Sequence, residues 1–149
     1  MRRRSSYAAS RSILRANSPI QTIDDVDRAG VRIAVSRGSA YDLFLSRGVI
    51  KRATFVRGAS PQASLDQFAA ERLEVLAGVK AVLVDYARSH PQCRVLPGRF
   101  MVIEQAMALP RGRPLAARYL REFIDEMKAS GFVAASLAKS GQKDAAVAP

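Results

Sequence analysis

Cysteine and histidine are scarce in this chain, which contains one of each, Cys93 and His90, among 149 residues. A single cysteine excludes a disulfide within the chain. Neither residue has the second histidine, paired cysteine or acidic cluster that would complete a metal site. Both are therefore predicted to lie in a surface loop, and no metal or cofactor is expected. Long apolar runs are absent too, since none approaches the ~20 residues that a membrane-spanning helix needs.

Catalytic motifs are missing as well. Ser39 lies in the sequence Arg-Gly-Ser-Ala-Tyr, which is not the Gly-x-Ser-x-Gly turn of a hydrolase nucleophile. Nothing in the sequence brings His90 near this serine. A phosphate-binding Gly-x-x-x-x-Gly-Lys and a dinucleotide-binding fingerprint do not occur. We therefore interpret the chain as a binding protein and not as an enzyme.

Positive charge is in excess: 24 Lys and Arg stand against 13 Asp and Glu, for a formal net charge of +11. Such a charge would suit a nucleic-acid partner, but no basic run contains interleaved aromatic residues and no recognition motif is present. Nucleic-acid binding is therefore not expected. Residues 1–4 resemble the start of an export signal, although no apolar segment follows them. Residues 1–11 are rich in Arg, Ser and Ala and are predicted to be a disordered basic tail.

Strand-like and helix-like segments alternate along the rest of the chain. Strands are predicted at four apolar runs, residues 31–35, 53–56, 73–77 and 94–96. Thr22 and Asp25 have capping-box spacing and predict a short helix, and Ser39 and Ser60 are candidate caps for the next helices. This alternation implies β-α-β units, so we predict an α/β fold with a mostly parallel sheet flanked by helices.

The C-terminal third is the clearest helix in the sequence. Six apolar residues recur there at helical spacing, namely Leu115, Tyr119, Leu120, Phe123, Ile124 and Met127. Gly131 ends this helix, and a second helical piece follows it. Residues 142–149 are predicted to be a flexible tail.

The most informative segment is residues 31–45, where a predicted buried strand leads through a sharp turn into a helix. This geometry directs backbone N–H groups and the positive end of the helix dipole toward one point, which favours an anion. We predict that the cradle consists of four consecutive residues, Arg37, Gly38, Ser39 and Ala40. The alternative is an ordinary helix start that Ser39 caps.

Loops that follow parallel strands converge on one edge of a sheet, so residues distant in sequence are predicted to join this site. Arg57 and Gly58 would supply a second set of donors, Lys80 a second cation, and Tyr41 a wall of the pocket. The alternatives are an ordinary strand-to-helix connection, a solvated lysine and a partly buried aromatic ring.

In their order and spacing these segments resemble a known family. Residues 19–25, 31–35 and the Gly38-Ser39 turn are similar to the second lobe of bacterial extracytoplasmic solute-binding proteins that serve amino-acid ABC importers (solute-binding family 3). Three later segments resemble further parts of the same family: residues 73–78 its strand near the hinge, 100–109 its return crossing, and 119–132 its C-terminal helices.

The resemblance implies a fold, a function and a location. It implies one lobe of a type II periplasmic binding protein at 12–109, with C-terminal helices at 110–141 that pack on a first lobe largely missing from the chain. The implied protein is a substrate-binding component, or a fragment of one, of an ABC transporter that binds a small carboxylate-bearing solute. A membrane permease is the implied partner and the periplasm the implied location, although a stand-alone product would be cytoplasmic.

Two alternatives stay open, an effector-binding module of a transcription regulator and a remnant of the fold that does not serve transport. Because an uncovered apolar helix face needs a partner, a homodimer is also expected. The sequence departs from the resemblance at one point. Amino-acid binders of this family commonly have an acid after the strand at 73–77, where this chain has Gly78-Val79-Lys80. Our hypothesis is that the ligand is a carboxylate or another organic acid and not a zwitterionic amino acid.

Overall fold

The computed structural model describes residues 2–141 and 145–149, with side chains from residue 9 onward. The chain divides into two compact units. One is Ala9–Met101, and the other combines the residues up to Ala8 with Val102–Pro149. The predicted lobe at 12–109 extends past the end of the first unit, because residues 102–109 belong to the second. No helix in the described part of the chain is long and apolar enough to cross a membrane.

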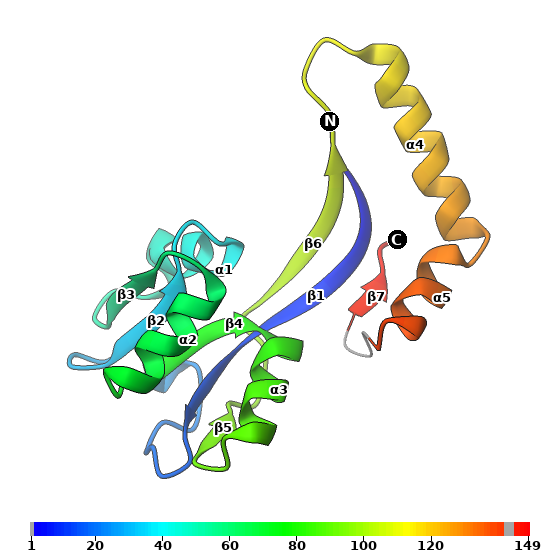
Figure 1. The fold of residues 1–149 in the computed structure, drawn as a ribbon. Coiled ribbons are helices and arrows are strands. Elements are labelled where there is room, and N and C mark those ends of the chain that lie inside the picture. Colours follow the sequence, from blue (N-terminus) through cyan, green and yellow to red (C-terminus); the bar gives the residue numbers. More distant parts are fainter. Residues whose placement is uncertain (1, 142–144) are drawn as a thin grey trace. The chain divides into compact units, whose positions relative to one another are not determined.

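A β-sheet forms the centre of the first unit, with the strand order β3-β2-β4-β1-β5 (Figure 1). Strands β2 (Arg32–Ser36), β3 (Thr54–Gly58) and β4 (Val75–Val79) run parallel to one another, as predicted. Strand β1 (Arg2–Arg15) lies between β4 and β5 (Cys93–Val95) and is antiparallel to both. The three parallel strands are the ones that position the candidate site.

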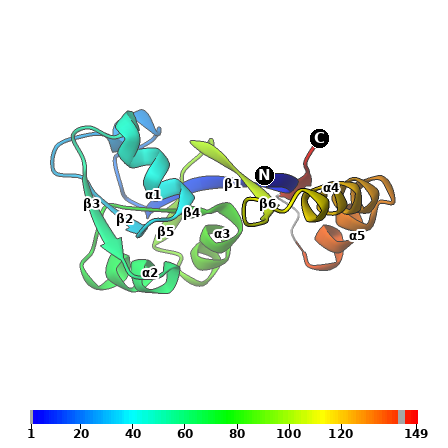
Figure 2. The same ribbon diagram turned by 90° about the horizontal axis from the view of Figure 1, so that it is seen from above.

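Helices cover both faces of this sheet. Helix α1 (Ala40–Phe44) and the wide helical turn η2 (Leu45–Val49) lie on one face, whereas α2 (Pro61–Ala70) and α3 (Lys80–Ser89) lie on the other (Figure 2). Under α2 and α3 the core consists of Ile13, Ala34, Phe68, Leu73, Leu76, Leu83 and Cys93. Cys93 is therefore buried at the start of β5, and its predicted place in a surface loop is wrong. Strand pairing with β1, which the local sequence does not encode, carries it inside.

The predicted helix caps form, with one difference in length. The Ser60 hydroxyl accepts the Ala63 N–H at 3.1 Å, and Pro61 takes the first position of α2. At residues 22–25 the capping-box bonds are present, since the Thr22 N–H donates to Asp25 Oδ2 at 3.0 Å. The helix that they begin is the single 3₁₀ turn η1 (Asp24–Val26) and not a longer helix.

The two chain ends differ from the expectation of disordered tails. Backbone hydrogen bonds to β4 and β7 (Ala145–Val147) hold β1 in an extended conformation. The predicted disorder is therefore wrong for residues 2–11, because the ladder partners of this segment lie far away in sequence. Met1 and residues 142–144 lie outside the described residues.

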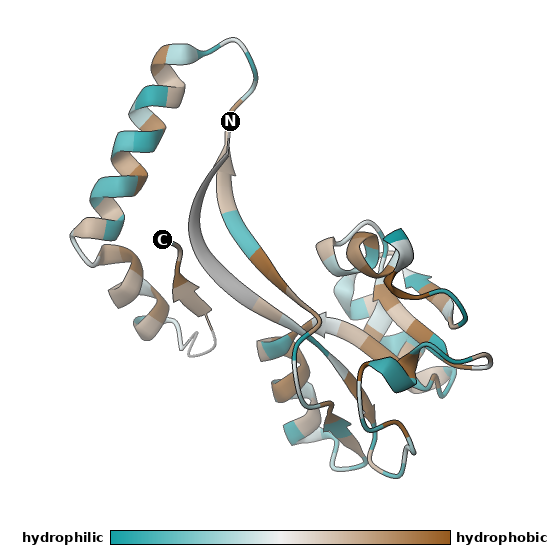
Figure 3. Ribbon diagram, turned by 180° about the vertical axis from the view of Figure 1, so that it is seen from behind, coloured by the Kyte–Doolittle hydropathy of each residue, from teal (hydrophilic) through white to brown (hydrophobic). Residues whose placement is uncertain are grey.

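The second unit contains the predicted C-terminal helices. Helix α4 (Pro114–Ala129) is followed by Gly131, whose φ of 78° suits glycine, and then by α5 (Phe132–Lys139). Strand β6 (Met101–Ala108) precedes α4 and pairs with β1. Figure 3 shows α4 in alternating hydrophilic and hydrophobic colours, in agreement with its sequence pattern. On its apolar face Ile124 is buried, whereas Leu115 and Tyr119 are exposed.

Candidate ligand site

The loops after β2 and β3 meet at the carboxyl edge of the sheet, as predicted. Ser36 pairs with Gly58 in the parallel ladder, and the Arg37 N–H donates to the Gly58 carbonyl at 2.9 Å. Strand β4 runs in the same direction beside β2, so Lys80 begins α3 at this edge too. The structure therefore brings the three predicted loops to one side of the sheet.

The turn between β2 and α1 has the expected local geometry. Gly38 has a φ of 70°, a left-handed conformation that few other residues adopt. The Ser39 hydroxyl accepts the Asp42 N–H at 3.1 Å, so Ser39 is the N-cap of α1. A Cβ atom on Gly38 would meet nothing within 4 Å. Backbone conformation, and not crowding, is therefore the reason for glycine here.

The protein's own carboxylate fills part of the predicted anion cradle. Asp42 is only 3% exposed, and its Oδ2 accepts the Gly38 N–H at 2.9 Å. The Ser39 N–H donates to the Ser36 carbonyl at 3.1 Å. Together with the bond from Arg37 to Gly58, three amides that the sequence analysis assigned to a ligand are therefore occupied. The signal for this was in the sequence, because an acid three residues after a helix cap commonly reaches back to the preceding amides.

Arg57, which the sequence analysis assigned to a ligand, bonds to this internal carboxylate. Its Nε donates to Asp42 Oδ1 and Oδ2 at 3.1 and 3.3 Å, and its terminal nitrogen donates to the Ser46 hydroxyl at 2.8 Å. The same hydroxyl donates to Asp42 at 3.1 Å. The guanidinium also lies 4.9 Å from the centre of the Phe55 ring. Asp42 and Arg57 thus form a closed pair below the turn, in which each bonds to the other and to Ser46. The Gly58 carbonyl accepts the Arg37 N–H.

The donors that remain belong to the first turn of α1. Neither the Ala40 amide nor the Tyr41 amide has a partner within the described residues, as is usual for the first N–H groups of a helix. Ala40 and the preceding Arg37 are exposed, whereas the Tyr41 side chain is buried. Lys80 is half-buried and already engaged in an interaction. The exposed part of the predicted cradle is therefore smaller than expected.

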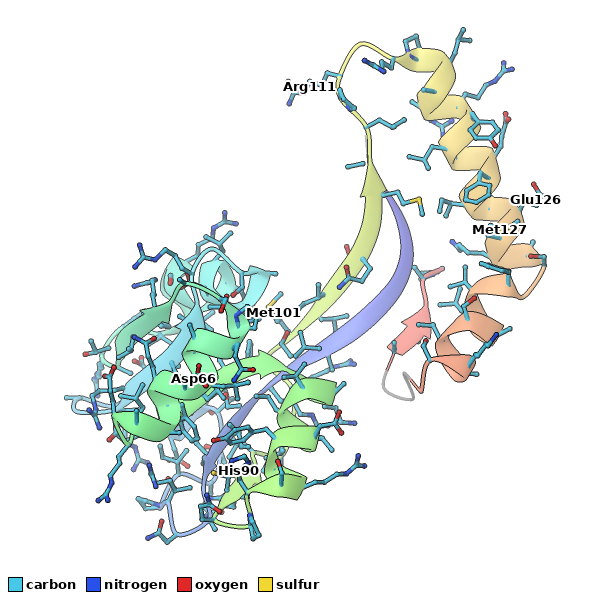
Figure 4. The ribbon with its side chains drawn as sticks, viewed as in Figure 1. Asp66, His90, Met101, Arg111, Glu126 and Met127 are labelled. Carbon is cyan, nitrogen blue, oxygen red and sulfur yellow. The ribbon has the colours of Figure 1, made fainter. Side chains whose placement is uncertain are left out.

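The single histidine and cysteine lie apart from this edge. The His90 ring stacks on Tyr86 with centroids 3.9 Å apart, and its Nδ1 lies 2.9 Å from the Tyr86 carbonyl, at the end of α3 (Figure 4). Burial raises the pKa of the Cys93 thiol, which keeps it in the unreactive protonated form. In the part of the chain that the structure describes, no three His, Cys, Asp or Glu residues are grouped so that they could hold a metal ion.

A hollow elsewhere in the first unit was not predicted. It has a volume of about 550 Å³, and none of the predicted ligand-binding residues lines it. Its walls come from η1, from the end of α1 through the loop before β3, and from the segment just before β6. No local sequence pattern could have indicated it, because three distant segments form it.

Comparisons with known proteins identify the fold. No family model and no curated protein matches this chain. Among solved structures, a mutant of ArgBP from T. maritima has a TM-score of 0.76 at 16% identity, over 92% of this chain and 59% of that one. A solute receptor for L-cysteine of Neisseria gonorrhoeae has a TM-score of 0.76 at 19% identity, over 92% of this chain and 55% of that one. A putative ABC-transporter binding component from Wolinella succinogenes, complexed with lysine, has a TM-score of 0.76 at 12% identity, over 89% of this chain and 58% of that one.

The fold is that of a type II periplasmic binding protein over the part of it that the chain spans. At sequence identities of 12–19%, these similarities show a shared fold and nothing more. The chain spans 55–59% of the length of these three structures, in agreement with the predicted single lobe and C-terminal helices.

Proposed function

We propose that this chain is the substrate-binding component, or the ligand-contacting lobe, of an ABC transporter and that it binds a small carboxylate-bearing solute. The observation that carries the proposal is the fold. The chain shares it with a solute receptor for L-cysteine and with a binding component of an ABC transporter that was complexed with lysine. The helix start at the carboxyl edge of the sheet supports it, because ligands of open α/β sheets bind at that edge. A membrane permease and a periplasmic location belong to the same proposal.

The ligand carboxylate is proposed to bind at the exposed start of α1. The amides of Ala40 and Tyr41 are the donors, and the Arg37 guanidinium adds charge. Ser39, Gly38 and the pair of Asp42 and Arg57 hold the turn in place without contacting the ligand. Because the buried carboxylate is already paired with Arg57, it does not cancel the positive end of the helix.

An organic acid suits this edge better than an amino acid does. The loops at residues 36–39, 57–60 and 77–80 contain Arg37, Arg57 and Lys80 but no acidic residue. Asp42, the acid nearest to the turn, is buried and bonded to Gly38 and Arg57. A ligand ammonium group would therefore meet positive charge and no carboxylate.

Binding by this chain alone is proposed to be weak. Ligand pockets bury most of a ligand's surface, and binding proteins of this kind close around the ligand from two sides. The chain spans 55–59% of the similar structures and offers one side of such a cleft. We expect dissociation constants above about 10 μM for the full chain as a monomer, since only the contacts of one side contribute.

The variant Ala40→Pro tests this site with little disturbance. Ala40 is the first residue of α1, where proline fits and only removes an N–H, and Ser39 already has the extended ψ of 159° that precedes a proline. In calorimetric titrations with succinate, pyruvate, lysine and arginine, the acids should bind, and the variant should weaken them about tenfold, as for one charge-assisted hydrogen bond.

The matched control is Pro61→Ala, which restores an N–H at the same position of α2 and should leave binding unchanged. Tight binding of lysine or arginine without binding of the acids would contradict the proposed ligand class. Unchanged affinity in Ala40→Pro would contradict the proposed site.

A further inference from the structure

The unpredicted hollow of about 550 Å³ has the size of a small-molecule pocket. It is lined by two aromatic rings, three aliphatic side chains, and charged residues of both signs. All of its walls belong to the first unit. It lies at the far end of α1 from the Ala40 amide, so it is separate from the site proposed above.

The apolar wall contains two phenylalanine rings at the surface. Phe44 and Phe100 stack with their centroids 6.3 Å apart and their planes inclined by 24°. Phe44 is 38% exposed and the neighbouring Val49 is 43% exposed. Phe100 directly precedes Met101, which Figure 4 labels at the start of β6. Exposed aromatic and aliphatic surface within a hollow favours an apolar ligand body.

A second, smaller cavity of about 50 Å³ adjoins this wall and shares Ile23, Arg99 and Phe100 with it. Arg11 also lines the smaller cavity, and its Nε is buried without a hydrogen-bond partner in the described part of the chain. Buried donors are nearly always satisfied in native proteins. A guanidinium with an unused donor therefore forms part of the wall of the smaller cavity.

The charge balance around the two cavities favours an anion. Asp27 lines the hollow, but its Oδ1 accepts the N–H groups of Lys51, Arg52 and Ala53 at 2.9, 2.6 and 3.1 Å. These bonds, of which that from Arg52 has the largest effect, lower the pKa of Asp27. The carboxylate is therefore occupied by the loop at residues 51–53. Against the remaining acid, Asp24, stand the basic side chains of Lys51, Arg52 and Arg99 in the hollow and of Arg11 in the smaller cavity.

We propose that these two neighbouring cavities, which share Ile23, Arg99 and Phe100, form a second binding site that takes an amphipathic organic anion. Its carboxylate lies between Arg11 and Arg99 in the smaller cavity, and its aryl or alkyl body lies in the hollow against Phe44 and Phe100. The smaller cavity, of about 50 Å³, has room for a small head group such as a carboxylate and not for a bulky one. The site does not depend on the proposed transport function.

The test uses the full chain and two probes with the same phenylbutyl body, the anion 4-phenylbutyrate and the neutral alcohol 4-phenylbutan-1-ol. Titrations followed by amide NMR should place the shifts of the acid at residues 44–52 and 96–100. The alcohol should bind at least tenfold more weakly. Arg99→Met should weaken the acid about tenfold, whereas Arg88→Met, the same change on an exposed arginine of α3, should not.

The outcomes separate the two sites. Ala40→Pro should leave 4-phenylbutyrate binding unchanged, so failure of the transport proposal does not touch this one. Equal affinity for the acid and the alcohol in the unaltered protein would overturn the anion site without any variant that could misfold. Shifts confined to residues 37–41, or equal binding by folded Arg99→Met, would overturn it as well.

Discussion

Replacing Asp42 by alanine should destabilise the first unit far more than replacing an exposed acid. The change removes the acceptor of the Gly38 N–H, of the Ser46 hydroxyl and of Arg57 Nε. The part-buried hydrogen bond from the Gly38 N–H loses its charged acceptor, which costs about 1.5–3 kcal/mol. The Arg57 side chain is 37% exposed and can turn to solvent, so its share is only about 0–1 kcal/mol. We expect a total loss of about 2–4 kcal/mol in the free energy of unfolding.

Urea unfolding followed by circular dichroism measures this loss. With a slope of about 1.5–2 kcal/mol per molar urea, the midpoint should fall by about 1–2.5 M. The matched control is Asp85→Ala, which breaks the exposed pair with Arg88 and should change stability by less than about 0.5 kcal/mol. A loss for Asp42→Ala within the error of that control would refute the closed pair of Asp42 and Arg57.

Acetate adds a second readout to the same variant. Removal of the Asp42 carboxylate frees the Gly38 N–H and the Arg57 guanidinium, which together form an anion site. Acetate should therefore raise the unfolding temperature of Asp42→Ala by mass action and have a smaller effect on the unaltered chain. An equal effect on both proteins would show that the vacated position does not bind an anion.

Two further predictions concern the frame around the site. Bonding to Arg32 lowers the pKa of Glu74 below its ordinary 4.5, so the stability from this pair is present above that pH and is lost as the pH falls through the depressed pKa. The difference in the free energy of unfolding between the unaltered chain and Glu74→Gln should therefore shrink from pH 7 to pH 3. The control Glu122→Gln, which breaks an exposed pair with Arg118, should show little difference at either pH. A difference for Glu74→Gln that stays constant with pH would contradict this. Gly58→Ala should cost about 1–3 kcal/mol, because its Cβ would lie 2.5 Å from Ser64 Oγ and 2.6 Å from the Ser64 amide nitrogen, and unchanged urea unfolding would contradict that close approach.

Local signals account for the parts of the fold that the sequence predicted well. The strand, turn and helix around Gly38 follow from an apolar run, a glycine at positive φ and a serine cap, all within a few residues. The C-terminal helices follow from apolar spacing and Gly131 in the same way. Each of these elements carries its own determinants, so the sequence was sufficient for them.

Features that depend on distant partners could not be predicted. The backbone of residues 2–11 belongs to β1, which pairs with β4 and β7, whereas its composition suggested a disordered tail. The bond from Gly38 to Asp42 follows a local capping pattern, but the pairing of Asp42 with Arg57, fifteen residues away, emerged only in three dimensions. The same holds for the hollow at Phe44 and Phe100, whose walls come from three separate segments.

A crystal structure of the full chain with succinate would show where the ligand carboxylate binds. We expect a carboxylate oxygen within hydrogen-bond distance, about 3 Å, of the Ala40 amide nitrogen at the start of α1, with Asp42 still bonded to Gly38. A ligand that binds at this edge without contacting α1, or one that displaces Asp42 from the turn, would contradict it.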